Sequence, residues 1–156
     1  MDTTINKHQM NLAAIIHIST FSKYFIPFGN FILPMIIWIS NKGQSAFVDE
    51  NGKNALNFQI SILLYSLFLG ILCIPFLLFS AFDFIQLANL LEHNTHDIDL
   101  PVRSLYDLSI GMIPVGIAGL LIFALFIADV LCTILAGIRA SKGILYQYPI
   151  TINFIK

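Results

Sequence analysis

Long apolar stretches without a charged residue dominate the chain, and short polar segments separate them. The uncharged runs are residues 24–41, 54–82 and 108–128. A helix needs about 20 mostly apolar residues to cross the hydrocarbon core of a bilayer. Segments 54–82 and 109–138 are long enough, so we predict a membrane-spanning helix in each. The second of these must accommodate Asp129.

The first apolar region, residues 10–40, is interrupted near its middle by Lys23 and Pro27. A single helix would hold the Lys23 ammonium near the bilayer centre, at a cost of several kcal/mol. Proline is also a strong breaker of helices. We therefore expect two short helices, about 7–24 and 28–40, that tilt or thin the bilayer in order to cross it. A single crossing here, and three in all, is the alternative.

Four crossings predict an all-α fold, a polytopic helical bundle that forms one membrane domain over residues 1–156. Residues 41–53 are expected to form a polar loop, and residues 83–108 an amphipathic outer segment with interfacial helices. Most Lys and Arg residues then share one side with both termini, and the positive-inside tendency makes that side cytoplasmic. The sequence thus predicts a multi-pass protein of the bacterial cytoplasmic membrane.

The composition supports a membrane protein and excludes several other classes. Of 156 residues, 57% are hydrophobic and 11% are charged, whereas a soluble domain carries roughly 25% charged residues. The 14 Phe residues exclude a disordered chain. A net charge of −1, with scattered basic residues, excludes a nucleic-acid footprint. Cys73 and Cys132 lie in apolar runs and are expected to be free thiols. No cofactor is expected.

Two polar stretches carry a family resemblance. Residues 45–60 read SAFVDENGKNALNFQI, and residues 140–152 read ASKGILYQYPITI. Together with HIST at 17–20, IPFG at 26–29 and PMIIW at 34–38, they resemble the bacterial domain-of-unknown-function family 4870. That family is regarded as distantly similar to the Tic-twenty component of chloroplast protein import. The resemblance implies four helices with both ends on one side, and it implies no established activity.

The two motifs supply the candidate site residues. In the first motif, Phe47 and Val48 are expected to dip into the membrane interface, Asp49 to favour the start of the coming helix, and Gly52 to permit a tight turn. The whole first set is Phe47, Val48, Asp49, Gly52, Lys53, Asn57, Phe58 and Gln59. The second set is Lys142, Gly143, Tyr146, Tyr148 and Pro149, which reads as an interfacial anchor. An ordered loop with an anchor, or a site for a lipid headgroup or peptide, both fit these residues.

Asp129 is the strongest single candidate for a functional residue, because an ionisable group inside a membrane helix is energetically costly. Its partner could be one of five polar residues: His17, Lys23, Asn57, Gln59 or Tyr65. Proton or ion coupling is one role, and a structural bond or a neutral carboxyl is the other. Small residues recur on the same helix at every fourth position: Ala124, Ala128, Cys132, Ala136 and Ala140. Such rows favour close helix packing, within the chain or between copies.

Three functions remain open from the sequence. The first is a non-enzymatic scaffold that interacts with lipid, with itself or with other membrane proteins, and the second is a small transporter or channel subunit that uses Asp129. The third is a metal-dependent or lipid-modifying enzyme, since His93 and His96 are spaced so that both imidazoles could face one metal. The chain lacks the common hydrolase, zinc-protease and nucleotide-binding motifs, which favours the scaffold.

Overall fold

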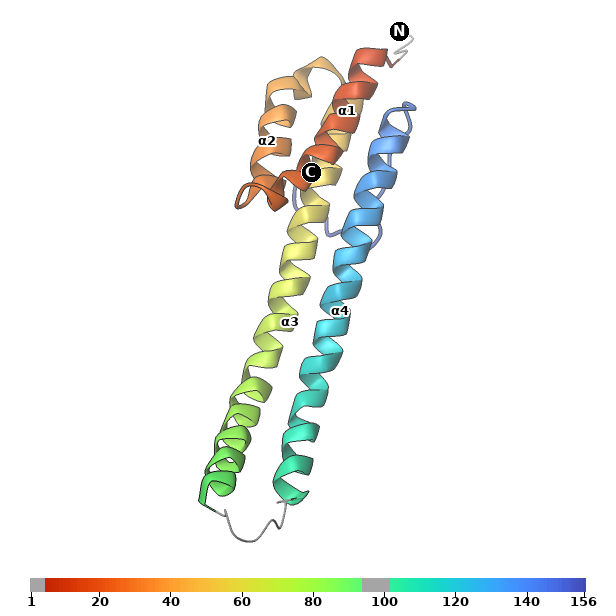
Figure 1. Cartoon of the computed structure of the whole chain (residues 1–156). Helices are drawn as coiled ribbons and strands as arrows, with labels where there is room; N and C mark the ends of the chain where they lie inside the picture. Colours follow the sequence, from red (N-terminus) through yellow and green to blue (C-terminus); the bar gives the residue numbers. More distant parts are fainter. Residues whose placement is uncertain (1–4, 94–101) are drawn as a thin grey trace. The chain divides into compact units, whose positions relative to one another are not determined.

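The computed structural model describes residues 5–93 and 102–156, and these residues contain helices and no strand. The predicted all-α fold is therefore confirmed for the described part of the chain. The elements in order are α1 (Lys7–Ser19), η1 (Thr20–Tyr24), α2 (Gly29–Asn41), η2 (Lys42–Gln44), α3 (Ala46–His93) and α4 (Val102–Ala140) (Figure 1).

The chain forms two compact units. One comprises Met1–Leu64 with Phe126–Lys156, and the other comprises Tyr65–Leu125. We call the first the four-helix unit, because it holds α1, α2, the start of α3 and the end of α4. We call the second the two-helix unit, since it holds only the remainders of α3 and α4.

Polar side chains define where the helices begin. Asn6 caps α1: its Oδ1 accepts from the His8 N–H at 3.1 Å, while Gln9 Oε1 accepts from the Asn6 N–H. This reciprocal pair satisfies two N–H groups that the first helical turn leaves free. Ser45 has an extended backbone, and its Oγ accepts from the Phe47 N–H at 3.1 Å. Helix α3 therefore starts directly after Ser45.

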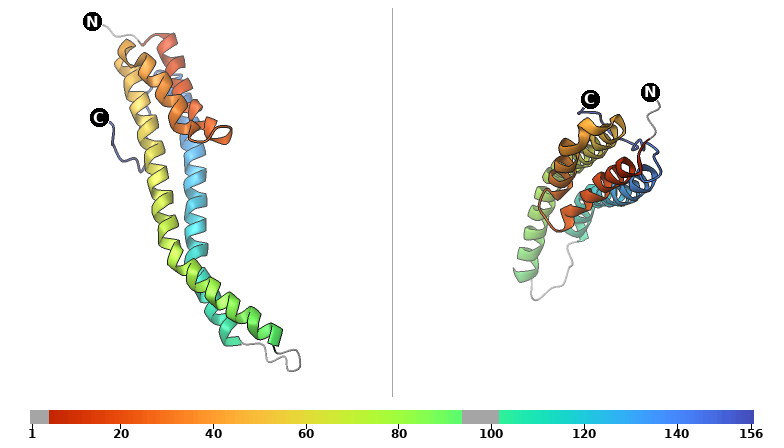
Figure 2. Two further views of the ribbon diagram at one scale, coloured as in Figure 1. Left: turned by 90° about the vertical axis from the view of Figure 1, so that its left-hand side faces the viewer. Right: turned by 90° about the horizontal axis from the view of Figure 1, so that it is seen from above.

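The turn that joins η1 to α2 is tightly closed. Phe28 has a φ of 58°, in the left-handed region that residues with a side chain rarely adopt. A Cβ at the next residue, Gly29, would lie 2.7 Å from the backbone of Ser22. Glycine at this position therefore lets α2 fold back against η1, and α1 and α2 lie side by side as an antiparallel hairpin (Figures 1 and 2).

Two helices are long and apolar enough to cross a membrane, over Ala46–Gln86 and Ser109–Ala140, and only 6% of their most apolar windows is buried. The expectation of four such helices is thus met in part. Helices α1 and α2 have 13 residues each, or about 20 Å at 1.5 Å per residue. The hydrocarbon core is about 30 Å thick, so a helix of 13 residues alone is shorter than the core.

The element boundaries differ from the expected ones at several places. Helix α3 begins at Ala46 rather than near residue 54, so most of the expected polar loop 41–53 is helical. It continues to His93, and α4 starts at Val102. Residues 83–93 and 102–108 therefore belong to the long helices. The rest of the expected outer segment, 94–101, lies outside the described residues.

Candidate functional site

A polar cluster around Asp129 joins four elements of the four-helix unit. Asp129 on α4 is 2% exposed and forms an ion pair with Lys23 from η1. Gln59 on α3 donates from Nε2 to the other carboxylate oxygen at 2.7 Å. Asn30 on α2 in turn donates from Nδ2 to Gln59 Oε1 at 2.9 Å. Both oxygens of the carboxylate are therefore engaged within the chain.

These contacts select among the five partners that the sequence offers for Asp129. Lys23 and Gln59 are bound to it, whereas His17 bonds to Asn51 and Tyr148 and Asn57 bonds to the C-terminal segment. A buried charge is tolerated when an opposite charge and hydrogen bonds satisfy it. Held in this way, Asp129 fixes the packing of the helices around it.

A second polar chain is centred on His17 of α1, which is fully buried. Its Nε2 lies 2.8 Å from Asn51 Oδ1, and its Nδ1 lies 2.9 Å from the Tyr148 hydroxyl. Asn51 uses its Nδ2 to donate to the Phe47 carbonyl, so its Oδ1 is the acceptor. His17 therefore donates from Nε2 and accepts from Tyr148 at Nδ1.

Tyr148 is held by the aromatic residues of the second motif and of α3. Its ring stacks on Phe58 at a centroid distance of 4.2 Å and meets the edge of Tyr146 at 5.0 Å. The Arg139 guanidinium lies 5.3 Å from the Tyr146 ring centroid. Burial raises the pKa of the Tyr148 phenol well above its usual value. The phenol thus stays protonated and can donate to His17.

The residues after α4 run back along α3 and are bound by its polar side chains. Asn57 accepts from the Phe154 and Ile155 N–H groups at 3.1 and 2.9 Å and donates to the Ile155 carbonyl at 3.0 Å. Ser61 Oγ accepts from the Ile152 N–H at 2.9 Å. The predicted motif residue Asn57 is therefore a clamp for the C-terminal segment.

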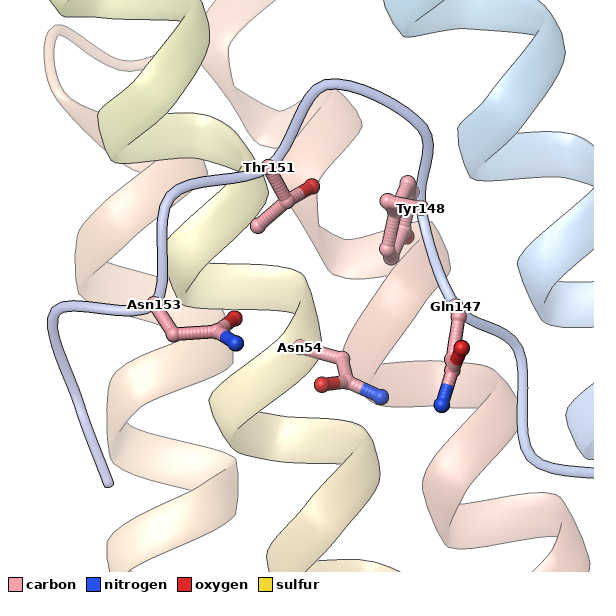
Figure 3. Close-up of a pocket in the computed structure, with 5 residues that line it drawn as sticks. All are labelled: Asn54, Gln147, Tyr148, Thr151 and Asn153. Atoms are coloured by element: carbon pink, nitrogen blue, oxygen red, sulfur yellow. The ribbon is translucent and has the colours of Figure 1, made fainter.

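A polar pocket of about 210 Å³ lies between α3 and the C-terminal segment. In Figure 3, Asn54 comes from α3, and the C-terminal segment supplies the other side chains. They are Gln147, Tyr148, Thr151 and Asn153. Asn54 already donates to the Tyr146 carbonyl at 3.1 Å. None of these lining residues is charged, so the pocket suits water or a small neutral group with several hydrogen-bonding atoms.

The first motif is placed differently from the sequence interpretation at two residues. Gly52 lies inside α3 rather than in a turn, and a Cβ there would come within 2.2 Å of the Trp38 ring. Glycine is thus needed for close packing of α2 on α3. Val48 is fully buried in the core with Trp38, and Phe47 packs against Ala13 and Ala14. Val48 therefore contacts protein on all sides, while Phe47 is half-buried and its contact with the membrane interface stays a prediction.

The charged residues of the first motif bond to their own surroundings. Asp49 lies in the first turn of α3 and accepts from Trp38 Nε1 at 2.9 Å. It also pairs with Lys53 at 2.6 Å, and Lys53 reaches Glu50 at 3.4 Å. The ion pair therefore supports the start of α3, and the hydrogen bond from Nε1 fixes the position of Trp38.

The second motif continues past α4 as an exposed turn. Gly143 has a φ of 74°, which glycine adopts readily, and this lets the chain leave the helix. Lys142 and Pro149 are exposed. The role of this segment as a membrane anchor stays a prediction.

The row of small residues changes its environment along α4. Cys132, Ala136 and Ala140 are buried in the four-helix unit, while Ala128 is half-buried. Ala124 is exposed in the two-helix unit. The row thus packs within the chain at its C-terminal end, and its role between copies stays a prediction.

The proposed metal ligands cannot be placed, because His96 and the side chain of His93 lie outside the part of the chain that the structure describes. Over the described residues, no group of three or more His, Cys, Asp or Glu residues could hold a metal ion. Sequence reasoning missed Asn30 and Trp38 as bonding partners of Gln59 and Asp49. The signal for Asn30 is a polar residue within an otherwise apolar run.

Comparison with known proteins assigns a family. A family model described as the magnetosome magnetite crystal formation protein family matches residues 8–155. Searches among curated proteins and among solved structures gave no match. The family match overturns the resemblance to domain-of-unknown-function family 4870 and to the Tic-twenty component, which rested on short motifs. Since the match covers nearly the whole chain, the protein belongs to the magnetosome magnetite crystal formation protein family.

Proposed function

We propose that the protein is a non-enzymatic membrane scaffold that supports magnetite crystal formation. The observation that carries this proposal is the internal pairing of the buried polar groups of the four-helix unit. His17, Gln59 and Asp129 each bond to other side chains of the same unit. Groups engaged in this way hold helices together, which is what a scaffold requires of them.

The outer surface of the protein supports the same proposal. On the two-helix unit, Phe68, Leu120 and Phe123 are 66%, 71% and 63% exposed. Such a surface suits contact with lipid and with the helices of other membrane proteins. Its partners are therefore expected to be the bilayer, further copies of this chain or other proteins of the same membrane.

A neutral version of the Asp129 pair separates the scaffold from a transporter that uses this carboxylate. The double variant Lys23→Gln with Asp129→Asn removes both charges and keeps side chains that can hydrogen-bond. It would replace the wild-type protein in a magnetosome-forming bacterium, and crystal sizes would be measured by electron microscopy. A scaffold predicts wild-type crystals, because replacing both members of the pair leaves no uncompensated buried charge.

The scaffold proposal is contradicted if the double variant reaches the wild-type level and the wild-type stability to unfolding but yields small or few crystals. That outcome would assign the carboxylate to ion or proton transport. Asp129→Ala alone is the matched control for misfolding, because it leaves Lys23 without its partner.

Native mass spectrometry tests whether the protein forms a complex, as a scaffold must. The tagged protein would be purified in mild detergent from the membrane in which it works. A complex with a stoichiometric second protein, or a multiple of 17.5 kDa, is expected. A lone monomer under conditions that preserve other membrane complexes would contradict a scaffold.

A further inference from the structure

The turn between η1 and α2 is apolar and exposed, unlike an ordinary helix connection in water. Tyr24, Phe25, Ile26 and Phe28 are 51%, 87%, 49% and 70% exposed. Turns in water are rich in Gly, Pro, Asn, Asp and Ser, and of these residue types Tyr24–Phe28 contains only Pro27. This turn lies at the free end of the hairpin made by α1 and α2 (Figures 1 and 2). Large aromatic side chains so placed are stabilised by an apolar solvent.

The α2 side of the hairpin is too short to carry the turn across a bilayer. Its polar ends, with exposed Lys7, His8 and Lys42, lie at one end of the four-helix unit (Figure 1). Helix α2 has 13 residues, which gives a length of about 20 Å. With the polar ends at one membrane surface, the turn therefore stops inside a hydrocarbon core of about 30 Å.

Several N–H groups of the turn bond within the chain. The Phe25 and Ile26 N–H groups both donate to the Ser22 carbonyl, and the Gly29 N–H donates to the Ile26 carbonyl. Ser22 uses its own hydroxyl to donate to the Ser19 carbonyl at 2.7 Å. In hydrocarbon each backbone polar group needs its partner within the protein, and these bonds supply one for the N–H groups of Phe25, Ile26 and Gly29.

The cation beside the turn is also neutralised within the chain. The Lys23 side chain is 22% exposed and pairs with Asp129, whose side chain is 3% exposed. A lysine at this depth without a partner would oppose insertion. The ion pair therefore makes the turn compatible with hydrocarbon.

The flanks of the hairpin continue the same apolar surface. On α1, Ile15 and Ile18 are more than half exposed, and on α2, Ile36 and Ile39 are too. In the same unit, Leu131 on α4, within a candidate span, is 56% exposed. The apolar surface of the hairpin thus belongs to the same unit as a lipid-exposed face of a spanning helix.

From these observations we propose that α1, η1 and α2 form a re-entrant hairpin, which enters and leaves the bilayer on one side. Its aromatic turn, Tyr24–Phe28, contacts lipid acyl chains within the hydrocarbon core. The protein then crosses the membrane twice, through α3 and α4, and its four-crossing topology is replaced by two crossings and a hairpin.

Thiol labelling on sealed membranes tests the depth of the turn. The variant Phe25→Cys would be made in a Cys73→Ala, Cys132→Ala background and exposed to a membrane-impermeant maleimide from each side. We expect no labelling from either side, and full labelling after detergent is added. Lys42→Cys, at the polar end of the hairpin, is the matched control and should react from one side only.

Either form of labelling before detergent would overturn the proposal. Reaction of position 25 from the side opposite to Lys42→Cys means that α1 and α2 cross the bilayer. Reaction from the same side means that the hairpin lies in water.

Fluorescence quenching identifies what covers the turn. Phe25→Trp would be reconstituted in phosphatidylcholine vesicles whose acyl chains carry bromine at different depths, with buried Trp38 as internal reference. Strong quenching that is largest for bromine deep in the chains is expected. Weak quenching at all depths, with cross-linking of copies through Phe25→Cys, would assign the turn to a second copy and overturn the lipid contact.

Discussion

The two units of this protein share the two long helices, but different interactions hold the helices together in each unit. In the four-helix unit, side chains from all the helical segments form bonds that specify which face meets which, as in Asn30–Gln59–Asp129–Lys23. The two-helix unit relies on apolar surface and close approach. Its Gly111 leaves room for Ser80, whose buried hydroxyl has no hydrogen-bond partner among the described residues.

The difference teaches that hydrophobicity alone does not define this fold. In lipid, apolar contact between helices competes with equally apolar lipid tails, so small residues and polar bonds supply specificity. The four-helix unit must position a hairpin and a C-terminal segment as well as two helices. Substitutions there should therefore cost more than matched substitutions in the two-helix unit.

The largest effect is expected from Asp129→Ala. It leaves the Lys23 ammonium and the Gln59 amide without their shared partner, and loss of one member of a buried pair costs about 3–5 kcal/mol. Thermal unfolding in detergent should show a large drop in the midpoint. The control is Ser80→Ala in the two-helix unit, which should be neutral or stabilising because Ser80 has no described hydrogen-bond partner. Equal effects of the two changes would remove the distinction between the units.

Gly52→Ala should follow, at about 1–3 kcal/mol, because the added methyl group overlaps the Trp38 ring and forces α2 away from α3. The matched control on the same helix is Gly70→Ala, whose Cβ meets no described atom within 4 Å. That change should be neutral or stabilise by up to about 1 kcal/mol, through helix propensity. Chemical unfolding of both variants measures the contrast. A harmless Gly52→Ala would contradict the close packing.

Asn57→Ala should release the end of the C-terminal segment, since three hydrogen bonds to Phe154 and Ile155 disappear. A loss of about 1–3 kcal/mol is expected. Hydrogen exchange should be faster at the Phe154 and Ile155 amides, with α3 and α4 unchanged. Asn153→Ala, at an exposed residue of the same segment, serves as control. Unchanged exchange in Asn57→Ala would rule out the clamp.

Tyr148→Phe should have the smallest effect, about 1 kcal/mol, because it removes the hydrogen bond to His17 and keeps the stack on Phe58. The pKa of Tyr148 is raised by burial, while the unfolded chain ionises near about pH 10. Its contribution to stability is thus present below about pH 10 and is lost as the pH rises further. Unfolding between pH 9 and 11 should show a weaker alkaline loss in the variant. Tyr106→Phe, at an exposed ring, is the control.

The sequence reveals most about the long helices, because an uncharged apolar run of sufficient length has one physical solution in lipid. It also marks Asp129 as unusual. The choice of Lys23 as partner, 106 residues away, depends on how helices rotate and pack, and helical periodicity does not encode that. Five polar residues satisfied the same local argument.

Gly52 shows a second limit. A glycine beside Asn51 and Lys53 indicates a turn just as well as a site of close helix contact. Only the position of the Trp38 ring decides between them. Likewise, His17, Asn51 and Tyr148 come from three distant segments, and each residue alone carries no sign of the others.

The proposed depth of the hairpin has a consequence for the membrane itself. A hairpin about 20 Å long in a hydrocarbon core of about 30 Å displaces more lipid from the leaflet that it enters than from the opposite one. A bilayer relieves such an imbalance by bending toward the enlarged side, and insertion of this kind is sensitive to curvature. The hairpin would therefore concentrate the protein where the membrane is already bent, and couple its position to the radius of the compartment in which a crystal grows.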